Sequence, residues 1–316
     1  MEQLTLLLFE ELEKEVKDTV PIFRKNVLLI DGNNLLNRCY HATAINPDKL
    51  QKSSDGRYTN GVNGFLKSLL KYRHTLDITH MGIFFDEGRG FRKELYPDYK
   101  ANRGETVAPL KEQFQLLKEK LTLMGLNLFC DSYYEADDLI ASMVEKLKDD
   151  QVYLLSNDKD LLQLVSENCI QIIRSGRNDV FYNSETFREK YGGLEPKQIV
   201  DIKALMGDDS DNLIGVPGIG EKGANKLIKY YGSVEAMVEG MKSGDIPKEL
   251  YRYKKLIDLN EENALFFKRL TLLVKEAKVD ANNLSKSIKK DEFMKTCEEL
   301  GFTDLKRSIE RGMYKL

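Results

Sequence analysis

Short apolar runs alternate with longer amphipathic stretches over the first two thirds of the chain. The apolar runs are rich in Val, Ile, Leu and Phe, which is typical of strands buried on both faces of a sheet. They cover residues 26–31, 79–86 and 151–160. Apolar residues recur at helical spacing over residues 61–73, 108–125 and 135–150. Strands that alternate with helices predict an α/β fold with a mostly parallel central sheet flanked by helices.

The pattern changes near residue 200. The sequence that follows has helical periodicity, with glycine-rich punctuation at 215–223 (GVPGIGEKG), and none of its apolar runs resembles a strand. We therefore predict an α/β core over residues 25–200 and a helical region over residues 201–316. Residues 1–24 carry an amphipathic pattern with acidic flanks, which predicts a helical N-terminal extension.

Composition narrows the class of protein. With 316 residues, 41% of them hydrophobic, the chain can form a sizeable core and two domains. Its charged residues are mixed in sign, and the formal net charge of −3 gives no sign of a nucleic-acid partner. The sequence has no transmembrane run and no secretory signal. Four cysteines and three histidines lack the spacing of a zinc site or a disulfide framework, so we expect reduced thiols and a cytoplasmic location.

Acidic residues gather where the predicted strands end. Asp31, Asp86, Asp158 and Asp160 all fall there. In a parallel sheet these ends share the edge at which ligands bind. Six more acids begin the helix after the second strand or follow the helix near residue 206: Glu135, Asp137, Asp138, Asp208, Asp209 and Asp211. One such acid alone is usually a turn, cap or helix-dipole residue, but their recurrence predicts a single cluster.

Crowded carboxylates repel one another, and a divalent cation removes that conflict. Carboxylate ligands without cysteine or histidine favour a hard ion, Mg²⁺ or Mn²⁺. The acids exceed what one magnesium ion uses, so we expect two or more ions. A pair roughly 3.5–4 Å apart would clamp the attacking and leaving oxygens of a phosphodiester.

Two segments are suited to binding phosphates. Residues 88–103 carry five basic and two acidic residues, a net charge of +3, with Tyr96 and Tyr99 among them. Basic and aromatic residues together are typical of single-strand binding. Residues 215–231 carry three lysines and one glutamate after glycines that let backbone N–H groups approach a phosphate. A helix after the first strand would hold Arg38 near the acidic edge. The alternatives are solvated loops and a surface arginine.

At these motifs the sequence resembles the 5′-nuclease family, which includes the 5′→3′ exonuclease domain of bacterial DNA polymerase I, free-standing phage 5′ nucleases and flap endonucleases. The motifs are LLIDGNN, FFDEGRGFRKELYPDYKANR, YEADDLIA, LLSNDKDLLQL and LMGDDSDNLIGVPGIGEKGANKLI, in family order over about residues 26–275. The resemblance implies a PIN-like nuclease core and an arch or clamp near residues 88–110. It also implies a DNA-binding helix-three-turn-helix near residues 207–232, which commonly holds K⁺ in this family.

The resemblance further implies roles for individual residues. The expected metal ligands are Asp31, Asp86, Glu135, Asp137, Asp138, Asp158, Asp160, Asp208 and Asp211. Asp209 matches no expected ligand. The expected catalytic residues are Lys100, Arg92 and Arg103. The expected DNA-binding residues are Arg38, Tyr99, Lys100, Arg103, Gly215, Gly218, Gly220, Lys222 and Lys226.

By this resemblance the chain is a monomeric, metal-dependent 5′→3′ exonuclease and flap endonuclease. Its expected substrates are DNA with 5′ flaps, overhangs or nicks, and RNA–DNA hybrids, in replication or primer removal. No polymerase segment follows, so we expect a free-standing phage-type enzyme in the cytoplasm of a bacterial or phage-infected cell. Asn157 and Gly223 depart from the family pattern, which usually has a small residue or threonine at the first position. A PIN-type ribonuclease and a non-catalytic branched-DNA-binding module with structural metals stay open as alternatives.

Overall fold

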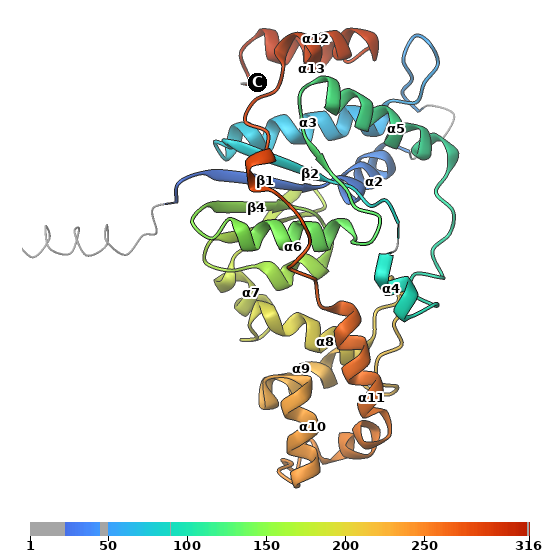
Figure 1. The fold of residues 1–316 in the computed structure, drawn as a ribbon, viewed down its shortest axis with the longest axis vertical. Coiled ribbons are helices and arrows are strands. Elements are labelled where there is room, and N and C mark those ends of the chain that lie inside the picture. The colour runs from blue at the N-terminus through green and yellow to red at the C-terminus, as the bar shows by residue number, and fades with distance from the viewer. Residues whose placement is uncertain (1–22, 45–49, 89, 315) are drawn as a thin grey trace, which may run out of the picture.

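The computed structural model describes residues 23–44, 50–88, 90–314 and 316. A sheet with helices on both faces forms the upper half of the molecule in Figure 1, and a helical region extends below it. This arrangement confirms the predicted α/β core with a helical second part. Residues 1–22, which make up most of the predicted N-terminal extension, lie outside the described residues.

The central sheet has six strands in the order β3-β2-β1-β4-β5-β6. They are β1 (Asn26–Asp31), β2 (His80–Phe84), β3 (Leu128–Phe129), β4 (Gln151–Leu155), β5 (Cys169–Ser175) and β6 (Asn178–Tyr182). All neighbours are parallel except β5 and β6. The apolar pattern predicted β1, β2 and β4. It missed β3, which has two residues, and β5 and β6, which mix polar with apolar residues.

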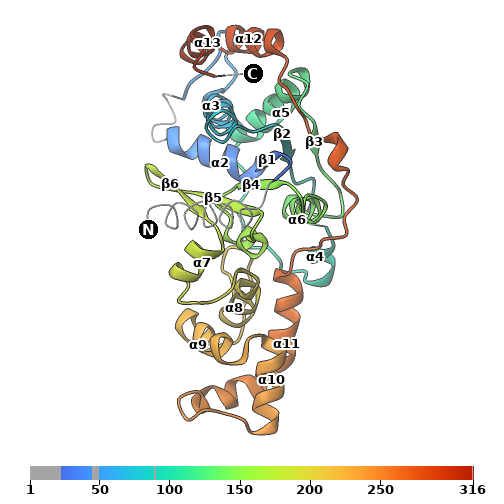
Figure 2. The same cartoon turned by 90° about the vertical axis from the view of Figure 1, so that its left-hand side faces the viewer.

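Helices cover both faces of the sheet (Figures 1 and 2). One face carries α2 (Gly32–Thr43), α3 (Asn60–Thr75) and α5 (Ala108–Leu123), and the other carries α6 (Ala136–Lys146) and the 3-10 turn η2 (Lys159–Leu164). The pleat of β1 divides its side chains between these faces. Leu28 and Ile30 join the cluster under α2 and α3, whereas Val27 and Leu29 join the cluster under α6.

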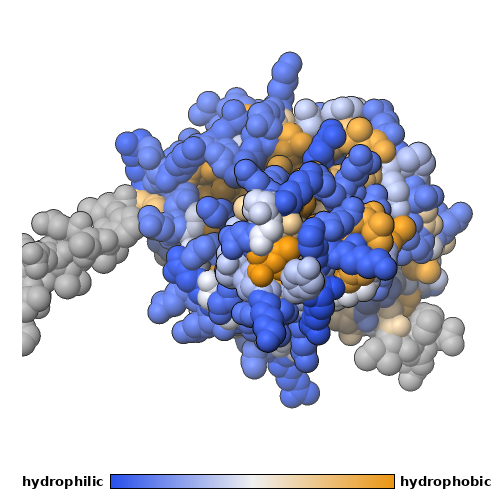
Figure 3. Space-filling model, turned by 90° about the horizontal axis from the view of Figure 1, so that it is seen from below, coloured by the Kyte–Doolittle hydropathy of each residue, from blue (hydrophilic) through white to orange (hydrophobic). Residues whose placement is uncertain are grey.

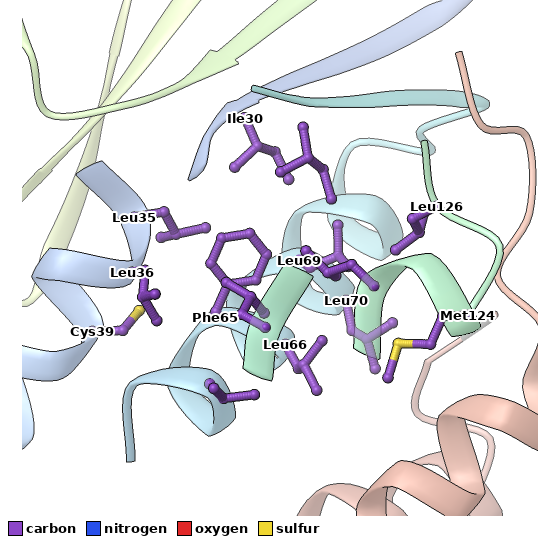
Figure 4. Packing of buried hydrophobic residues seen from close by; sticks show 14 of the residues in the cluster. Ile30, Leu35, Leu36, Cys39, Phe65, Leu66, Leu69, Leu70, Met124 and Leu126 are labelled. Atoms are coloured by element: carbon purple, nitrogen blue, oxygen red, sulfur yellow. The ribbon is translucent and has the colours of Figure 1, made fainter. Parts of the chain in front are cut away.

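The packing under α2 and α3 fixes the end of β1, where the first predicted site residue lies. Figure 4 shows Phe65 of α3 beside Leu35 of α2 and below Ile30 of β1, with Leu69 of α3 on the side of Phe65 away from Leu35. All four side chains are fully buried. Burial of such a side chain contributes about 1.5–3 kcal/mol, so this cluster holds the strand and the helix that follows it in one position.

The helical region has its own core. It contains α7 (Ser184–Lys190), the turn η3 (Pro196–Gln198), α8 (Ile199–Met206), α9 (Glu221–Tyr231), α10 (Val234–Ser243), the turn η4 (Tyr251–Tyr253) and α11 (Lys254–Thr271). Leu205, Ile228, Met237 and Ala264 are buried between these helices. The end of this region, seen from below in Figure 3, is covered mostly by hydrophilic side chains, with apolar groups in small patches.

Residues 281–310, the last part of the predicted helical region, form helical elements that pack on the α/β core. After α11 the chain returns to the α/β core through η5 (Ala281–Asn283), α12 (Lys290–Glu299) and α13 (Thr303–Glu310). Ser285 exchanges two backbone hydrogen bonds of 2.8 Å with Met81 of β2. Phe293 and Phe302 are buried in the cluster under α3 and α5, so this segment belongs to the core.

Two further features bear on the sequence predictions. The expected arch segment contains one short helix, α4 (Gly90–Leu95), which lies near the upper end of α11 in Figure 1. No helix formed by the described residues has the length and apolar character needed to span a membrane.

Candidate functional site

The predicted strand-end acids lie together because their strands are neighbours. Asp31 ends β1, and Asp86 and Asp158 follow β2 and β4, which flank β1 in the sheet. Parallel pairing brings these three carboxyl ends to one edge. Gly32 allows the tight turn from β1 into α2, since a Cβ atom there would lie 2.5 Å from the Phe85 ring.

Hydrogen bonds orient two of these carboxylates. One oxygen of Asp31 accepts from the backbone N–H of Asn34 at 2.9 Å and caps α2, and the other accepts from the Ser156 hydroxyl at 2.8 Å. Asp86 accepts from the backbone N–H of Ala136 at 2.8 Å. This last bond fixes the start of α6 beside the end of β2, so the acids of the first turn of α6 reach the same edge.

Four predicted ligands form no ion pair with any residue that the structure describes: Asp31, Asp86, Asp137 and Asp158. We call them the uncompensated acids. Burial, with the negative charges of Asp86 and Asp158, raises the pKa of Asp31 to about 7. Burial and the charges of its three neighbours also raise the pKa of Asp137 well above its ordinary value, and burial raises the pKa of Asp158. Together the four carboxylates therefore repel one another.

The uncompensated acids fit a hard divalent cation by the chemistry of their donors. All four offer carboxylate oxygens, and a bound cation would remove the repulsion and the burial penalty that raise the pKa values of Asp31, Asp137 and Asp158. Within the described ranges, no three acidic, histidine or cysteine side chains converge on one point as a completed cation site. The match thus lies in donor type and charge.

Lys203 was not predicted as a site residue. Its ammonium group, on α8, contacts the carboxylates of Asp160 and, at 2.6 Å, of Asp208. It thereby joins an acid of the α/β core to an acid of the loop after α8. The sequence signal was a lysine within the apolar helix IVDIKALM, which is not specific enough to predict an ion pair.

Lys100 and Arg103 also bind acids directly. The Lys100 ammonium lies 2.7 Å from Glu135, and the Arg103 guanidinium lies 2.8 Å from Asp211. Lys100 has a φ of 53°, a left-handed conformation that residues other than glycine rarely adopt. Its backbone N–H donates to the carbonyl of Asp211 at 3.0 Å. The segment that carries Lys100 and Arg103, two of the three predicted catalytic cations, is therefore held against the loop that carries Asp211.

Arg92 and Asp138 form a buried ion pair. Arg92 is 2% exposed and Asp138 is 0% exposed. The guanidinium binds both oxygens of the carboxylate, at 2.6 and 2.8 Å, and donates to the backbone carbonyls of Leu270 and Leu272. Asp138 is thus the counter-ion of Arg92 in this structure, and the expected roles of Asp138 as a metal ligand and Arg92 as a catalytic residue stay predictions.

With this pair included, the acids that have a cation partner are Glu135, Asp138, Asp160, Asp208 and Asp211. We call them the compensated acids. The cations that pair with these acids also act on an uncompensated one, because Lys203 and Lys100 lower the pKa of Asp158.

Tyr99 does not offer its ring for base stacking in this structure, and its expected role in DNA binding stays a prediction. The side chain is 2% exposed. Its hydroxyl contacts Glu135 at 2.8 Å and Asp211 at 3.1 Å. Tyr96, the second aromatic residue of the segment, packs on Phe266 and Phe267 of α11. The part of the predicted arch that carries Tyr96 and Tyr99 therefore packs against the core and α11, whereas residues 101–108 are exposed.

The glycine-rich loop lies between α8 and α9. Gly215 has a φ of 67°, and a Cβ atom there would lie 2.3 Å from the backbone nitrogen of Gly207, so this position requires glycine. Gly218 has a φ of 91°, and Gly220 is the N-cap residue of α9. Lys222 and Lys226 of α9 are exposed and, within the described residues, have no acidic partner.

Arg38 contacts the segment that follows β4. One terminal nitrogen donates to the side-chain oxygen of Asn157 at 2.7 Å. Arg38, Lys71 and Arg174 line a cavity of about 480 Å³ beside the end of β4. The structure therefore joins Arg38 to the residue that precedes Asp158, whereas the α9 lysines lie on a separate helix.

Two family models match the chain. One describes the N-terminal resolvase-like domain of 5′-3′ exonucleases and matches residues 26–192, and the other describes their C-terminal SAM fold and matches residues 194–293. A 5′-3′ exonuclease of Halalkalibacterium halodurans is 37% identical over 257 residues, 79% of this chain and 84% of that protein. DNA polymerase I of Bacillus subtilis is 35% identical over 290 residues, 89% of this chain but 32% of the polymerase.

Solved structures show the same similarity. The T5 5′-exonuclease with bound zinc ions has a TM-score of 0.64 and 25% identity, over 78% of this chain and 89% of that one. A bacteriophage T5 flap endonuclease in a complex with DNA and metal ions has a TM-score of 0.64, 24% identity and the same coverage, and supports the fold.

Proposed function

The chain belongs to the 5′-3′ exonuclease family and is a nuclease, and from this premise we propose that it cuts DNA in a structure-specific manner near 5′ single-strand/duplex junctions. The substrates we propose are 5′ flaps, overhangs and nicks. The uncompensated acids carry this proposal, because four carboxylates, Asp31 buried and the other three partly buried, have no cation partner among the described residues and therefore need positive charge.

We infer that Asp31, Asp86, Asp137 and Asp158 hold divalent cations, Mg²⁺ or Mn²⁺. When bound, such ions activate water and stabilise the leaving oxygen of a phosphodiester. The T5 5′-exonuclease, which resembles this chain in fold and is described with bound zinc, supports the binding of divalent metal ions. The cations of the chain then complete the surroundings of the phosphate, and we assign Lys100 to this task because it lies 2.7 Å from Glu135 at the edge of the acids.

Two surfaces would position the DNA. The glycine-rich loop and exposed Lys222 and Lys226 suit a duplex backbone, because backbone N–H groups at a helix start and free lysines both attract phosphates. Arg38 and Arg103 suit the strand near the acids. We also propose K⁺ at the glycine-rich loop, which an exchange of K⁺ for Na⁺ in a duplex-binding assay would test. RNA–DNA hybrids belong in the same assay as a second substrate.

The working state we propose is a monomer in the cytoplasm. Among the described residues Cys39, Cys130, Cys169 and Cys297 are free thiols, which suits a reducing compartment. Light scattering of the purified protein, with and without flap DNA, would measure the oligomeric state.

Asp158→Asn tests the proposed catalysis. The change keeps the shape of the side chain and removes its charge, so we expect flap binding within a few-fold of wild type and a loss of cleavage in Mg²⁺ of roughly a thousand-fold or more. Asp209→Asn is the matched control, since Asp209 is exposed in the nearby loop and is not a predicted ligand. We expect it to cut normally.

Normal cleavage by Asp158→Asn would refute the assigned role. Product mapping on a labelled 5′ flap, with plain single-stranded RNA beside it, separates the two alternatives. A protein that binds the flap without cutting it is a binding module, and one that prefers the RNA is a ribonuclease. The same mapping measures the balance of exonuclease and endonuclease products.

A further inference from the structure

Asn157 occupies a position at which the resembled family usually has a small residue or threonine. It lies between Ser156, which donates to Asp31, and Asp158, an uncompensated acid. Its backbone N–H donates to the side-chain oxygen of Asn34 at 2.9 Å, and the N–H of Asn34 in turn donates to Asp31. This position therefore connects the end of β4 with the first turn of α2.

The side chain of Asn157 makes three further hydrogen bonds. Its oxygen accepts from Arg38 at 2.7 Å and from the backbone N–H of Arg174 at 2.8 Å. Its amide nitrogen donates to the carbonyl of Arg174 at 3.0 Å. The opposite orientation of the amide would place donors against two donors, so the environment itself selects this one. A small residue or threonine could not make this set of bonds.

Arg38 keeps its charge free in this arrangement. Its guanidinium has five donors, and one of them bonds a neutral amide. The other two cations of the same cavity, Lys71 and Arg174, both pair with Asp179. Within the described residues Arg38 is thus the cation on this cavity without an acidic partner, and Asn157, which binds it, directly precedes the uncompensated acid Asp158 in the chain.

We propose that Asn157 is a positioning residue that holds Arg38 for a backbone phosphate of the DNA. A neutral amide can fix the guanidinium without cancelling its charge, which an aspartate at the same position would do. Arg38 is the residue that touches the phosphate, and Asn157 acts through it. This inference rests on the proposed function and names the contact that anchors the substrate next to the acids.

A double-mutant cycle tests the proposal: wild type, Asn157→Ala, Arg38→Ala and the double variant. Binding of a 5′-flap DNA is measured in chelator over a range of salt. Loss of one phosphate contact lowers the slope of log K against log salt by about 1. We expect this change, with about ten-fold weaker binding, in Arg38→Ala, and a smaller loss of about three-fold to five-fold in Asn157→Ala. Because one residue acts through the other, the double variant should match Arg38→Ala.

Asn157→Asp supplies a readout that a structural role would not change. The carboxylate can still accept from Arg38 and from the backbone of Arg174, so the arginine stays in place, but its charge is cancelled. We expect binding at least as weak as that of Asn157→Ala, with a raised KM for flap cleavage and a nearly unchanged kcat.

Additive losses in the double variant would overturn the proposal, as would wild-type binding and salt slope in Asn157→Ala. Unfolding midpoints of all variants show whether each is folded at the assay temperature, and the assay temperature is set below the lowest midpoint. Because the cycle is read from binding in chelator, it is decided separately from catalysis. A wild-type protein that binds the flap without cutting it would refute the proposed function alone.

Discussion

The compensated and uncompensated acids lie at one site but differ in how their charge is stabilised. Glu135, for example, has Lys100 at 2.7 Å, whereas Asp31 has hydrogen bonds from a backbone N–H and a hydroxyl but no cation. The chain therefore provides its own positive charge for the acids that join its segments together. It leaves the acids at the centre of the sheet edge for a cation from outside. A list of acidic residues in the sequence cannot reveal this division.

The largest expected effect comes from breaking a compensated pair. Arg92→Ala leaves Asp138 buried without a partner and should lower the free energy of unfolding by about 3–5 kcal/mol. Urea unfolding followed by circular dichroism measures this loss. Glu94→Ala is the control, since Glu94 lies on the same short helix and is exposed. It should change stability by less than about 0.5 kcal/mol.

A second variant separates lost charge pairing from lost packing. Replacing both partners, as Arg92→Met with Asp138→Leu, removes the buried charge as well as its counter-ion. Buried pairs replaced by apolar residues often recover stability, so the double variant should be more stable than Arg92→Ala. If Arg92→Ala instead proves as stable as wild type, then Arg92 and Asp138 do not form a buried pair in solution.

Much of the site could be predicted because it follows from local pattern. Apolar runs place β1, β2 and β4, and parallel pairing then brings Asp31 and Asp158 to one edge whatever the rest of the chain does. The pairing of the acids could not be predicted in this way. Arg92 reaches Asp138 across 46 positions, and Lys203 reaches Asp160 across 43, so both contacts depend on how separate elements pack.

The basic and aromatic segment shows a second limit of sequence pattern. A row of cations and tyrosines can contact DNA, or it can contact acids of the same protein, and the composition is identical in both cases. In this structure Tyr99 and Lys100 contact Glu135. The return of α12 to the core was also hidden, because amphipathic helices carry no sign of which apolar surface they cover.

A smaller effect on the free energy of unfolding is expected from an uncompensated acid, and it changes with pH. Asp31 has a pKa of about 7 in the folded protein, against 3.8 ordinarily. From about pH 4 to pH 7 the folded protein keeps a proton that the unfolded chain has released, so this group lowers stability as pH rises through that window. Asp31→Asn removes the cost. In chelator it should be more stable than wild type by about 2 kcal/mol at pH 8, and equal to it at pH 4.

Thermal unfolding in chelator at both pH values measures this effect, and Mg²⁺ should shrink the difference at pH 8 by stabilising wild type. Asp211→Asn is the contrasting control, because it removes the partner of Arg103. It should not stabilise the protein at any pH. Equal gains from the two variants would show that the two groups of acids do not differ.

The smallest expected effect is on DNA binding, from replacing a lysine that has no acidic partner among the described residues. Lys222 is exposed on α9, so Lys222→Gln should leave stability and metal response unchanged. If it contacts a duplex phosphate, binding of flap DNA should weaken by a few-fold and the salt slope should fall by about 1, with kcat unaltered. Fluorescence anisotropy over a salt series measures the slope, with Lys255→Gln on α11 as a charge-matched control. A changed affinity for Mg²⁺ in Lys222→Gln would contradict this separation. It would mean that the charge of Lys222 already stabilises the acidic carboxylates.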